Sequence, residues 1–301
     1  MIRFLRIALF GSIKRGKNML QIITDSASDI TLAQAAAMNI HVVPIKIQFE
    51  DGDCLQETEE DFAVFYERLQ KSKSLPVTSQ PSPEQYLTLF STAKENGDDV
   101  LVLPISSGLS GSINGIQAAK ELCDYDRIYI VDSRQAIAGQ RILVEHAAML
   151  RDAGVSAEKI VQEVETLRDR ISIIGVIDTL EYLRKGGRIP NSLAMLGSAL
   201  NIKPVIALED RILKTVGKAM GHSAGKKQLC RRFEKDTPDP DYPIYFLYSS
   251  NRQMGEAFMK EMVSQYDLRG YDTRLLPVCG VIGTHVGTNC VGVCYVSKGK
   301  D

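Results

Sequence analysis

The stretch that decides the fold is DVLVLPISSGLSGSINGIQAAKEL, residues 99–122. Residues 99–105 form a near-continuous apolar run, which is typical of a strand buried on both faces of a parallel sheet. The loop SSGLSGS follows, and a helical pattern then extends from about Ser112 to Leu122. A strand, a short loop and a helix in this order form the repeating unit of an α/β fold.

Similar units flank this stretch on both sides. Strand patterns occur at residues 21–24, 40–47 and 127–133. Helical patterns begin near Leu32 and cover residues 59–71, 83–95 and 137–151. Because the two patterns alternate, we predict an α/β fold whose first domain is a doubly wound parallel sheet. Ligands of such sheets bind at the carboxyl ends of the strands.

The pattern changes after Gly154. A charged amphipathic helix is predicted over residues 156–170, and IIGVID, residues 173–178, begins a second series of strands. PVIALEDRILKTV, residues 204–216, has two β-rich runs around Glu209-Asp210 and predicts a hairpin, so the second sheet should be mixed with helices around it. We predict domains at residues 19–154 and 155–301. The basic residues 1–18 are expected to be a disordered leader with at most transient membrane contact.

Charge and cysteine usage narrow the class of protein. Lys and Arg total 36 against 37 for Asp and Glu, so no basic field would attract nucleic acid. The six cysteines include no CxxC pair and no neighbouring histidine at the spacing of zinc ligands. We therefore expect reduced, mostly buried thiols, a cytoplasmic protein and no metal site.

Two loops gather hydroxyl groups in front of predicted helices. In SSGLSGS, Ser107 and Ser110 alternate with glycines, and the following helix adds free N–H groups that suit an anion; a plain flexible turn is the alternative. In TSQPSPEQY, Thr78 and Ser79 precede a Ser-Pro-Glu helix start, so an ordinary capping loop is the alternative. Both loops are candidates for a binding site.

Two further segments stand out near the middle and the end of the chain. GVIGTHVGTN places Thr284 and His285 among glycines, although a lone histidine is more often structural. YLRKGGRIP packs Arg184, Lys185 and Arg188 around two glycines, as either a solvated turn or a docking surface for an acidic partner.

A serine hydrolase is a weaker interpretation of the same residues. A nucleophile elbow requires G-x-S-x-G, but Ser112 stands where the second glycine is required after Ser110. No motif supplies the carboxylate that would orient His285. Catalysis by Ser107 or Ser110 with His285 therefore ranks below binding.

Eight segments taken together resemble the DegV family, which includes the FakB subunits of bacterial fatty acid kinase. They are TDSASDI, VVPIKIQFEDG, TSQPSPEQY, ISSGLSGS, VDS, LRKGGRI, IKPVIALEDRIL and THVG, in this order over roughly residues 20–297. The resemblance implies a fatty acid held between two α/β domains, with its tail in an apolar tunnel and its carboxylate near Thr78, Ser107 or Ser110, and His285. We include the neighbouring Ser79 and Thr284 in this predicted ligand site.

The resemblance also implies a carrier rather than an enzyme. It implies no catalytic residue and no cofactor, and a dihydroxyacetone-kinase-like partner that would phosphorylate the bound carboxylate. The chain departs from the FakB-like pattern at Met220, where those members tend to carry arginine, and at Thr288-Asn289, where THVG usually continues Pro-Gly. We expect a binder of long-chain fatty acid. A hydrolase or acyltransferase and a binder of another small carboxylic acid remain as alternatives.

Overall fold

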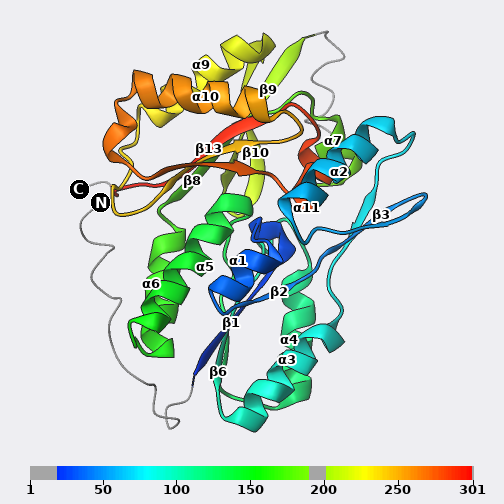
Figure 1. Ribbon diagram of the computed structural model, residues 1–301, viewed down its shortest axis with the longest axis vertical. Coiled ribbons are helices and arrows are strands. Elements are labelled where there is room, and N and C mark those ends of the chain that lie inside the picture. Colours follow the sequence, from blue (N-terminus) through cyan, green and yellow to red (C-terminus); the bar gives the residue numbers. More distant parts are fainter. Residues whose placement is uncertain (1–18, 190–200, 300–301) are drawn as a thin grey trace.

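The computed structural model describes residues 19–189 and 201–299. These residues contain two large β-sheets and one small one (Figure 1). The first large sheet is entirely parallel, with strand order β2-β1-β6-β7. Its strands are β1 (Leu20–Asp25), β2 (His41–Val43), β6 (Asp99–Leu103) and β7 (Ile128–Ile130). The parallel sheet predicted for the first half of the chain is confirmed.

Helices cover both faces of the parallel sheet. They are α1 (Leu32–Ala37), α3 (Pro83–Asn96), α4 (Ser112–Cys123), α5 (Ile137–Asp152) and α6 (Ala157–Arg168). On β6, Val100 and Val102 pack with α3 and α4, while Leu101 and Leu103 join the cluster that contains α5. Since alternate residues of a strand point to opposite faces, both faces of β6 are buried and its sequence is apolar throughout.

The second large sheet has the order β10-β9-β8-β13-β11-β12. Its strands are β8 (Ile171–Val176), β9 (Ile202–Glu209), β10 (Ile212–Met220), β11 (Ile244–Tyr248), β12 (Thr273–Pro277) and β13 (Val291–Val296). Only the pairing of β11 with β12 is parallel, so the predicted mixed sheet is confirmed, as is the hairpin β9–β10. Helices α9 (Gly221–Phe233) and α10 (Arg252–Gln265) cover the outer face through a second apolar cluster.

The predicted domain boundary near residue 155 falls before α6. This helix contacts α5 and β6 of the parallel sheet, and β8 of the second sheet begins just after it. The two-domain division stays a prediction, and these contacts favour a division after Arg168.

A small antiparallel sheet, β4-β3-β5, projects from the parallel sheet beside α2 (Figure 1). It contains β3 (Lys46–Phe49), β4 (Gly52–Cys54) and β5 (Val77–Ser79), and α2 spans Glu59–Lys71. The single strand predicted over residues 40–47 was wrong, because the chain leaves the parallel sheet between β2 and β3, at Pro44 and Ile45. Proline has no N–H to donate to the ladder between β2 and β1, so Pro44 is a natural place for the strand to break.

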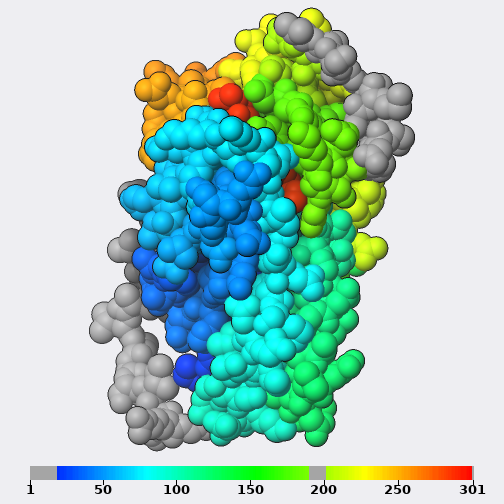
Figure 2. Space-filling view, turned by 90° about the vertical axis from the view of Figure 1, so that its right-hand side faces the viewer, coloured from blue at the N-terminus to red at the C-terminus, as the bar shows by residue number. Residues whose placement is uncertain are grey.

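Helix α11 (Gly280–Val286) belongs to the second half of the sequence but packs on the first half. It contacts α2, β3, β5 and the short turn η1 (Ser26–Ser28), as well as α7 (Glu181–Lys185). A second short turn, η2, spans Leu268–Gly270. Figure 2 shows a small red area, from the C-terminal part of the chain, set between the cyan and green surfaces. The two halves therefore interlock along this side.

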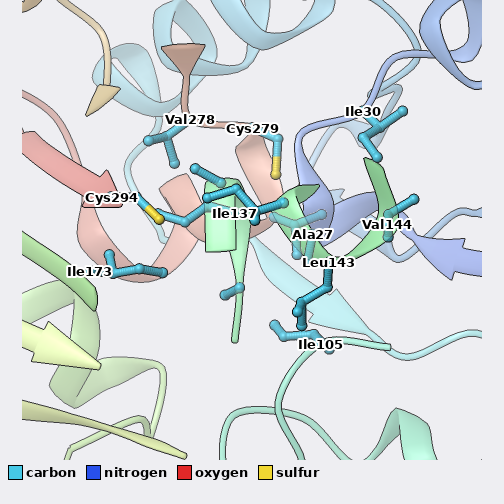
Figure 3. Packing of buried hydrophobic residues seen from close by; sticks show 14 of the residues in the cluster. Ala27, Ile30, Ile105, Ile137, Leu143, Val144, Ile173, Val278, Cys279 and Cys294 are labelled. Carbon is cyan, nitrogen blue, oxygen red and sulfur yellow. The ribbon is translucent and has the colours of Figure 1, made fainter. Parts of the chain in front are cut away.

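The two halves also meet where the β9–β10 hairpin touches the loop after β6. The Ser106 hydroxyl donates to the Arg211 carbonyl at 2.8 Å, and a Cβ placed on Gly108 would lie 2.3 Å from that oxygen. Only glycine fits at 108 in this arrangement. Figure 3 shows the core between the halves, with Ile105 and Ile137 from one and Ile173 and Val278 from the other.

The sequence predicted a leader with at most transient membrane contact at residues 1–18. Residues 1–18, predicted to be a leader, lie outside the described residues. Within the described ranges, no helix is long and apolar enough to cross a bilayer.

Candidate functional site

A cavity of about 460 Å³ lies between the two large sheets. Its walls are mostly apolar side chains from both halves of the chain. They include Ile105, Ala136, Ile137, Ile173, Ile206, Leu208, Leu213, Leu247, Val278, Val281, Ile282 and Val286. Such a space suits a long apolar ligand that enters between the sheets.

Two glycines leave room on the floor of this cavity. In the second sheet, Gly175 of β8 pairs with Gly292 of β13, and Ile206 and Leu247 flank them on the adjacent strands. All four residues line the cavity. A Cβ on Gly175 would meet no atom closer than 3.4 Å, so this glycine is not required for packing and instead keeps the cavity open.

The polar part of the lining centres on Thr78 and His285. Thr78 comes from β5 and His285 from α11, and the Thr78 Oγ1 and His285 Nε2 atoms are 3.2 Å apart. Because β5 belongs to the small sheet and α11 packs against it, residues 207 positions apart meet here. The structure thus brings two of the predicted ligand residues together.

The imidazole of His285 is buried and neutral at ordinary pH. Burial lowers its pKa to about 4, and the nearby positive charge of Arg188 acts in the same direction. Among the described residues its Nδ1 has no hydrogen-bond partner. A Cβ on Gly186 would lie 2.3 Å from that nitrogen, so the ring packs directly against the backbone of the turn after α7.

Arg188 was predicted to belong to a docking surface, but its side chain lines the cavity. Its Nε donates to the Leu109 carbonyl at 3.1 Å, and a terminal nitrogen donates to the Gly186 carbonyl at 2.5 Å. Burial lowers the pKa of this guanidinium. Within residues 19–189 and 201–299, no carboxylate lies within ion-pair distance of it, and it is the one charged group of the lining. Arg188 therefore offers a positive charge to a ligand.

The predicted serines differ in position. Ser110 lines the cavity, with its hydroxyl 2.9 Å from that of Ser112. Ser107 is absent from the lining formed by the described residues, and its hydroxyl donates to Asp132 at 2.6 Å. Ser79 lines the cavity next to Thr78.

Other predicted residues are turned away from the cavity or lie at the surface. Thr284 is buried, and its hydroxyl donates to the Gly280 carbonyl of its own helix at 2.9 Å. Arg184 and Lys185 are exposed on α7.

Met220 is 66% exposed at the end of β10, so this departure from the FakB-like pattern lies on the surface. Thr288 lines a surface depression with Tyr182 and Lys185.

The predicted ligand site left out Gln80 and the two glycines of the cavity floor. Gln80 stands in the TSQP segment, and its side-chain oxygen lies close to Gly111, where a Cβ would come within 2.6 Å. The presence of Gln80 beside Thr78 was a usable signal. The pair of Gly175 and Gly292 had none, because nothing in either strand reveals that the two glycines face each other.

Comparison with known proteins settles the family. The model of the DegV family, described as an uncharacterised protein family, matches residues 19–298. The chain belongs to the DegV family. A DegV domain-containing protein of Deinococcus radiodurans is 31% identical over 91% of this chain and 97% of its own length. The predicted family is therefore confirmed.

Solved DegV structures share the fold. A fatty acid binding DegV protein, SAG1342 of Streptococcus agalactiae, has a TM-score of 0.82 with 27% identity, covering 94% of this chain and 100% of its own. A DegV protein of Thermus thermophilus, described by its fatty acid binding, has a TM-score of 0.81 with 27% identity, covering 93% of this chain and 99% of its own. Both of these DegV relatives are described as binding fatty acid.

The buried state of His285 predicts an unusual titration. In protein freed of bound lipid, the His285 imidazole should remain neutral until the pH falls to about 4, as followed by NMR of its ring nitrogens. An unfolded histidine takes up its proton near 6.5. Stability from neutral His285 is thus complete above about 6.5 and decreases as the pH falls towards 4. The His285→Gln variant identifies the resonance, and titration at pH 6 or above would contradict this account.

Proposed function

We propose that this chain binds a long-chain fatty acid and performs no chemistry on it. The observation that carries the proposal is the cavity itself, an apolar space whose described lining contains one charged group, Arg188, near the Thr78–His285 pair. A single cation beside neutral donors at an otherwise apolar cavity matches a molecule with one carboxylate and a long hydrocarbon tail.

The head group would be held by neutral donors and one charge. The Thr78 hydroxyl and the His285 Nε2 can each donate to a carboxylate oxygen, since the imidazole is neutral and its protonated nitrogen can change with the ligand. Arg188 would supply a charge-assisted partner, and Ser79, Ser110 and Gln80 add further polar groups. No cofactor or metal is needed for this binding.

The tail would supply most of the affinity. Each CH₂ group removed from water contributes about 0.8 kcal/mol, so a sixteen-carbon chain offers roughly 12 kcal/mol before the costs of association and desolvation. The part of the cavity above Gly175 and Gly292 leaves space for such a tail against Ile206 and Leu247. The fatty-acid-binding relatives support the same ligand class.

The geometry does not favour the serine hydrolase alternative. The hydroxyl of Ser107 is engaged by Asp132, and that of Ser110 by Ser112. The hydroxyl that meets His285 is that of Thr78, and the other ring nitrogen has no carboxylate to orient it among the described residues.

We further propose that the chain presents its bound fatty acid to a fatty acid kinase. The exposed Arg184 and Lys185 of α7 stand close to the helix that carries His285, because α7 contacts α11. Lys73 and Lys185 also border the surface depression that contains Thr288. A dihydroxyacetone-kinase-like partner with an acidic docking face could therefore reach the head-group end of the cavity from this side.

Protein purified from bacteria should contain fatty acid. Mass spectrometry after denaturation is expected to release a long-chain fatty acid from the wild type. The Thr78→Val variant keeps the shape of residue 78 but loses the hydroxyl, so its affinity for fatty acid should fall about three- to tenfold. Affinity for the matching methyl ester should change less. Wild-type protein that contains no fatty acid and does not bind added palmitate or oleate would refute the proposed function.

The cavity floor at Gly175 and Gly292 should limit the length of the fatty acid that binds. Gly175→Ala should fold, since the nearest atoms leave ordinary contact distances around a new Cβ. Gly175→Val adds two further methyl groups, and both side chains fill the cavity floor. The fatty acids bound by these variants, measured by mass spectrometry, should become progressively shorter. Gly270→Ala, where a Cβ meets nothing within 4 Å, is the control. An unchanged distribution in Gly175→Val would place the tail elsewhere.

The docking surface predicts a loss of transfer without a loss of binding. Arg184→Glu combined with Lys185→Glu should reduce acyl phosphate formation with a fatty acid kinase subunit about tenfold or more, by removing charge attraction. The Kd for fatty acid should remain unchanged. Lys260→Glu, at an exposed site on α10, is the matched control. Equal transfer by all three proteins would rule out this docking surface.

A further inference from the structure

The carboxyl group of Asp29 links the two halves of the chain directly. Its Oδ1 accepts a hydrogen bond from the Cys279 amide at 2.9 Å, across 250 positions of sequence. Cys279 is the residue immediately before α11, at its N-cap. Asp29 itself follows the turn η1, which lies at the end of β1 in the parallel sheet.

Helix α11 has seven residues, too few to be stable by itself, so its position depends on its contacts. The Tyr66 hydroxyl donates to the Val278 carbonyl at 2.9 Å, and the Gln56 side chain accepts from the Gly280 amide. The Asp29 bond is the third link at this end of the helix. These three links precede His285 by five to seven residues.

A small displacement of α11 would change the lining of the cavity. Val281, Ile282, His285 and Val286 of this helix all line it. The distance of 3.2 Å between Thr78 and His285 therefore depends on where α11 begins.

Asp29 occupies an energetically costly position. Its φ of 57° is left-handed, a conformation that aspartate and asparagine tolerate better than most residues. The residue is buried, and within the described part of the chain its Oδ2 has no hydrogen-bond partner. Burial raises the pKa of this carboxyl to about 7, although hydrogen bonds from Cys279 and the charge of Arg141 act to lower it. Such strain often marks a functional role.

We propose that Asp29 is a positioning residue for the head-group site: by accepting the Cys279 amide, it fixes the start of α11 and so holds His285 beside Thr78 at the ligand carboxylate. This inference rests on the proposed binding of fatty acid. It assigns Asp29 no contact with the ligand. Its effect should be larger on the recognition of the carboxylate than on the binding of the tail.

Three variants separate the hydrogen bond from the backbone conformation. Asp29→Asn keeps both an acceptor oxygen and tolerance of positive φ, whereas Asp29→Gly keeps only the tolerance. Cys279→Pro removes the donor instead: the φ of −64° suits proline, and the ring Cδ, which takes the place of the amide hydrogen facing the Asp29 Oδ1, displaces the carboxyl group from the start of α11. The last variant keeps the test open if Asp29→Gly fails to fold.

The readout is the ratio of affinities for palmitate and its methyl ester, measured with the full chain freed of bound lipid. We expect Asp29→Gly and Cys279→Pro to lower this ratio about three- to tenfold, and Asp29→Asn to keep it within about twofold. In a His285→Gln background, Asp29→Gly should not lower the ratio further, because the two residues act through one interaction.

An equal loss of affinity for both ligands in Asp29→Gly and Cys279→Pro would show a merely structural role and overturn the proposal. An unchanged ratio in both variants would overturn it as well. Failure of the proposed function gives a different result, since the wild type would then bind neither ligand.

Discussion

The close packing of α11 on α2 is the constraint on which the head-group site depends. A Cβ on Gly280 would lie 2.6 Å from the Phe65 ring, and one on Gly283 would lie 2.7 Å from Phe65 and Tyr66. Glycine at both positions therefore allows a helix from the end of the chain to lie directly on one from its beginning. Without this approach, His285 and Thr78 would not meet, and the two sheets would have no common polar site.

The electrostatics of the site follow from burial. His285 stays neutral because charging a buried ring beside Arg188 would cost free energy. Arg188 keeps hydrogen bonds to two backbone carbonyls but has no carboxylate partner in the described part of the chain. A ligand carboxylate would complete this arrangement. The polar groups thus select an anion, while the surrounding isoleucines, leucines and valines require that the rest of the ligand be apolar.

The cavity is maintained by local departures from ordinary packing. Ile137, at the start of α5, lines it with a φ of 46°, which is strained for a β-branched residue. Gly175 omits a side chain where the sheet has room for one, whereas Gly292 is required by the Ile174 carbonyl, which would lie 2.9 Å from a Cβ there. The loop after β6 is tied to the β9–β10 hairpin by the Ser106 bond to Arg211, next to Gly108, where no larger residue fits. These features keep open a space that hydrophobic packing would otherwise close.

The sequence by itself determined the α/β class, the two large sheets, the hairpin and most helix positions, because those follow from local apolar periodicity and capping. Family motifs pointed to Thr78 and His285 as well. It could not show the break of the strand at Pro44, the inward direction of Arg188 or the engagement of Ser107 by Asp132. Nor could it pair Gly175 with Gly292 or Asp29 with Cys279. Those facts depend on which distant segments come into contact, and only the tertiary structure decides this.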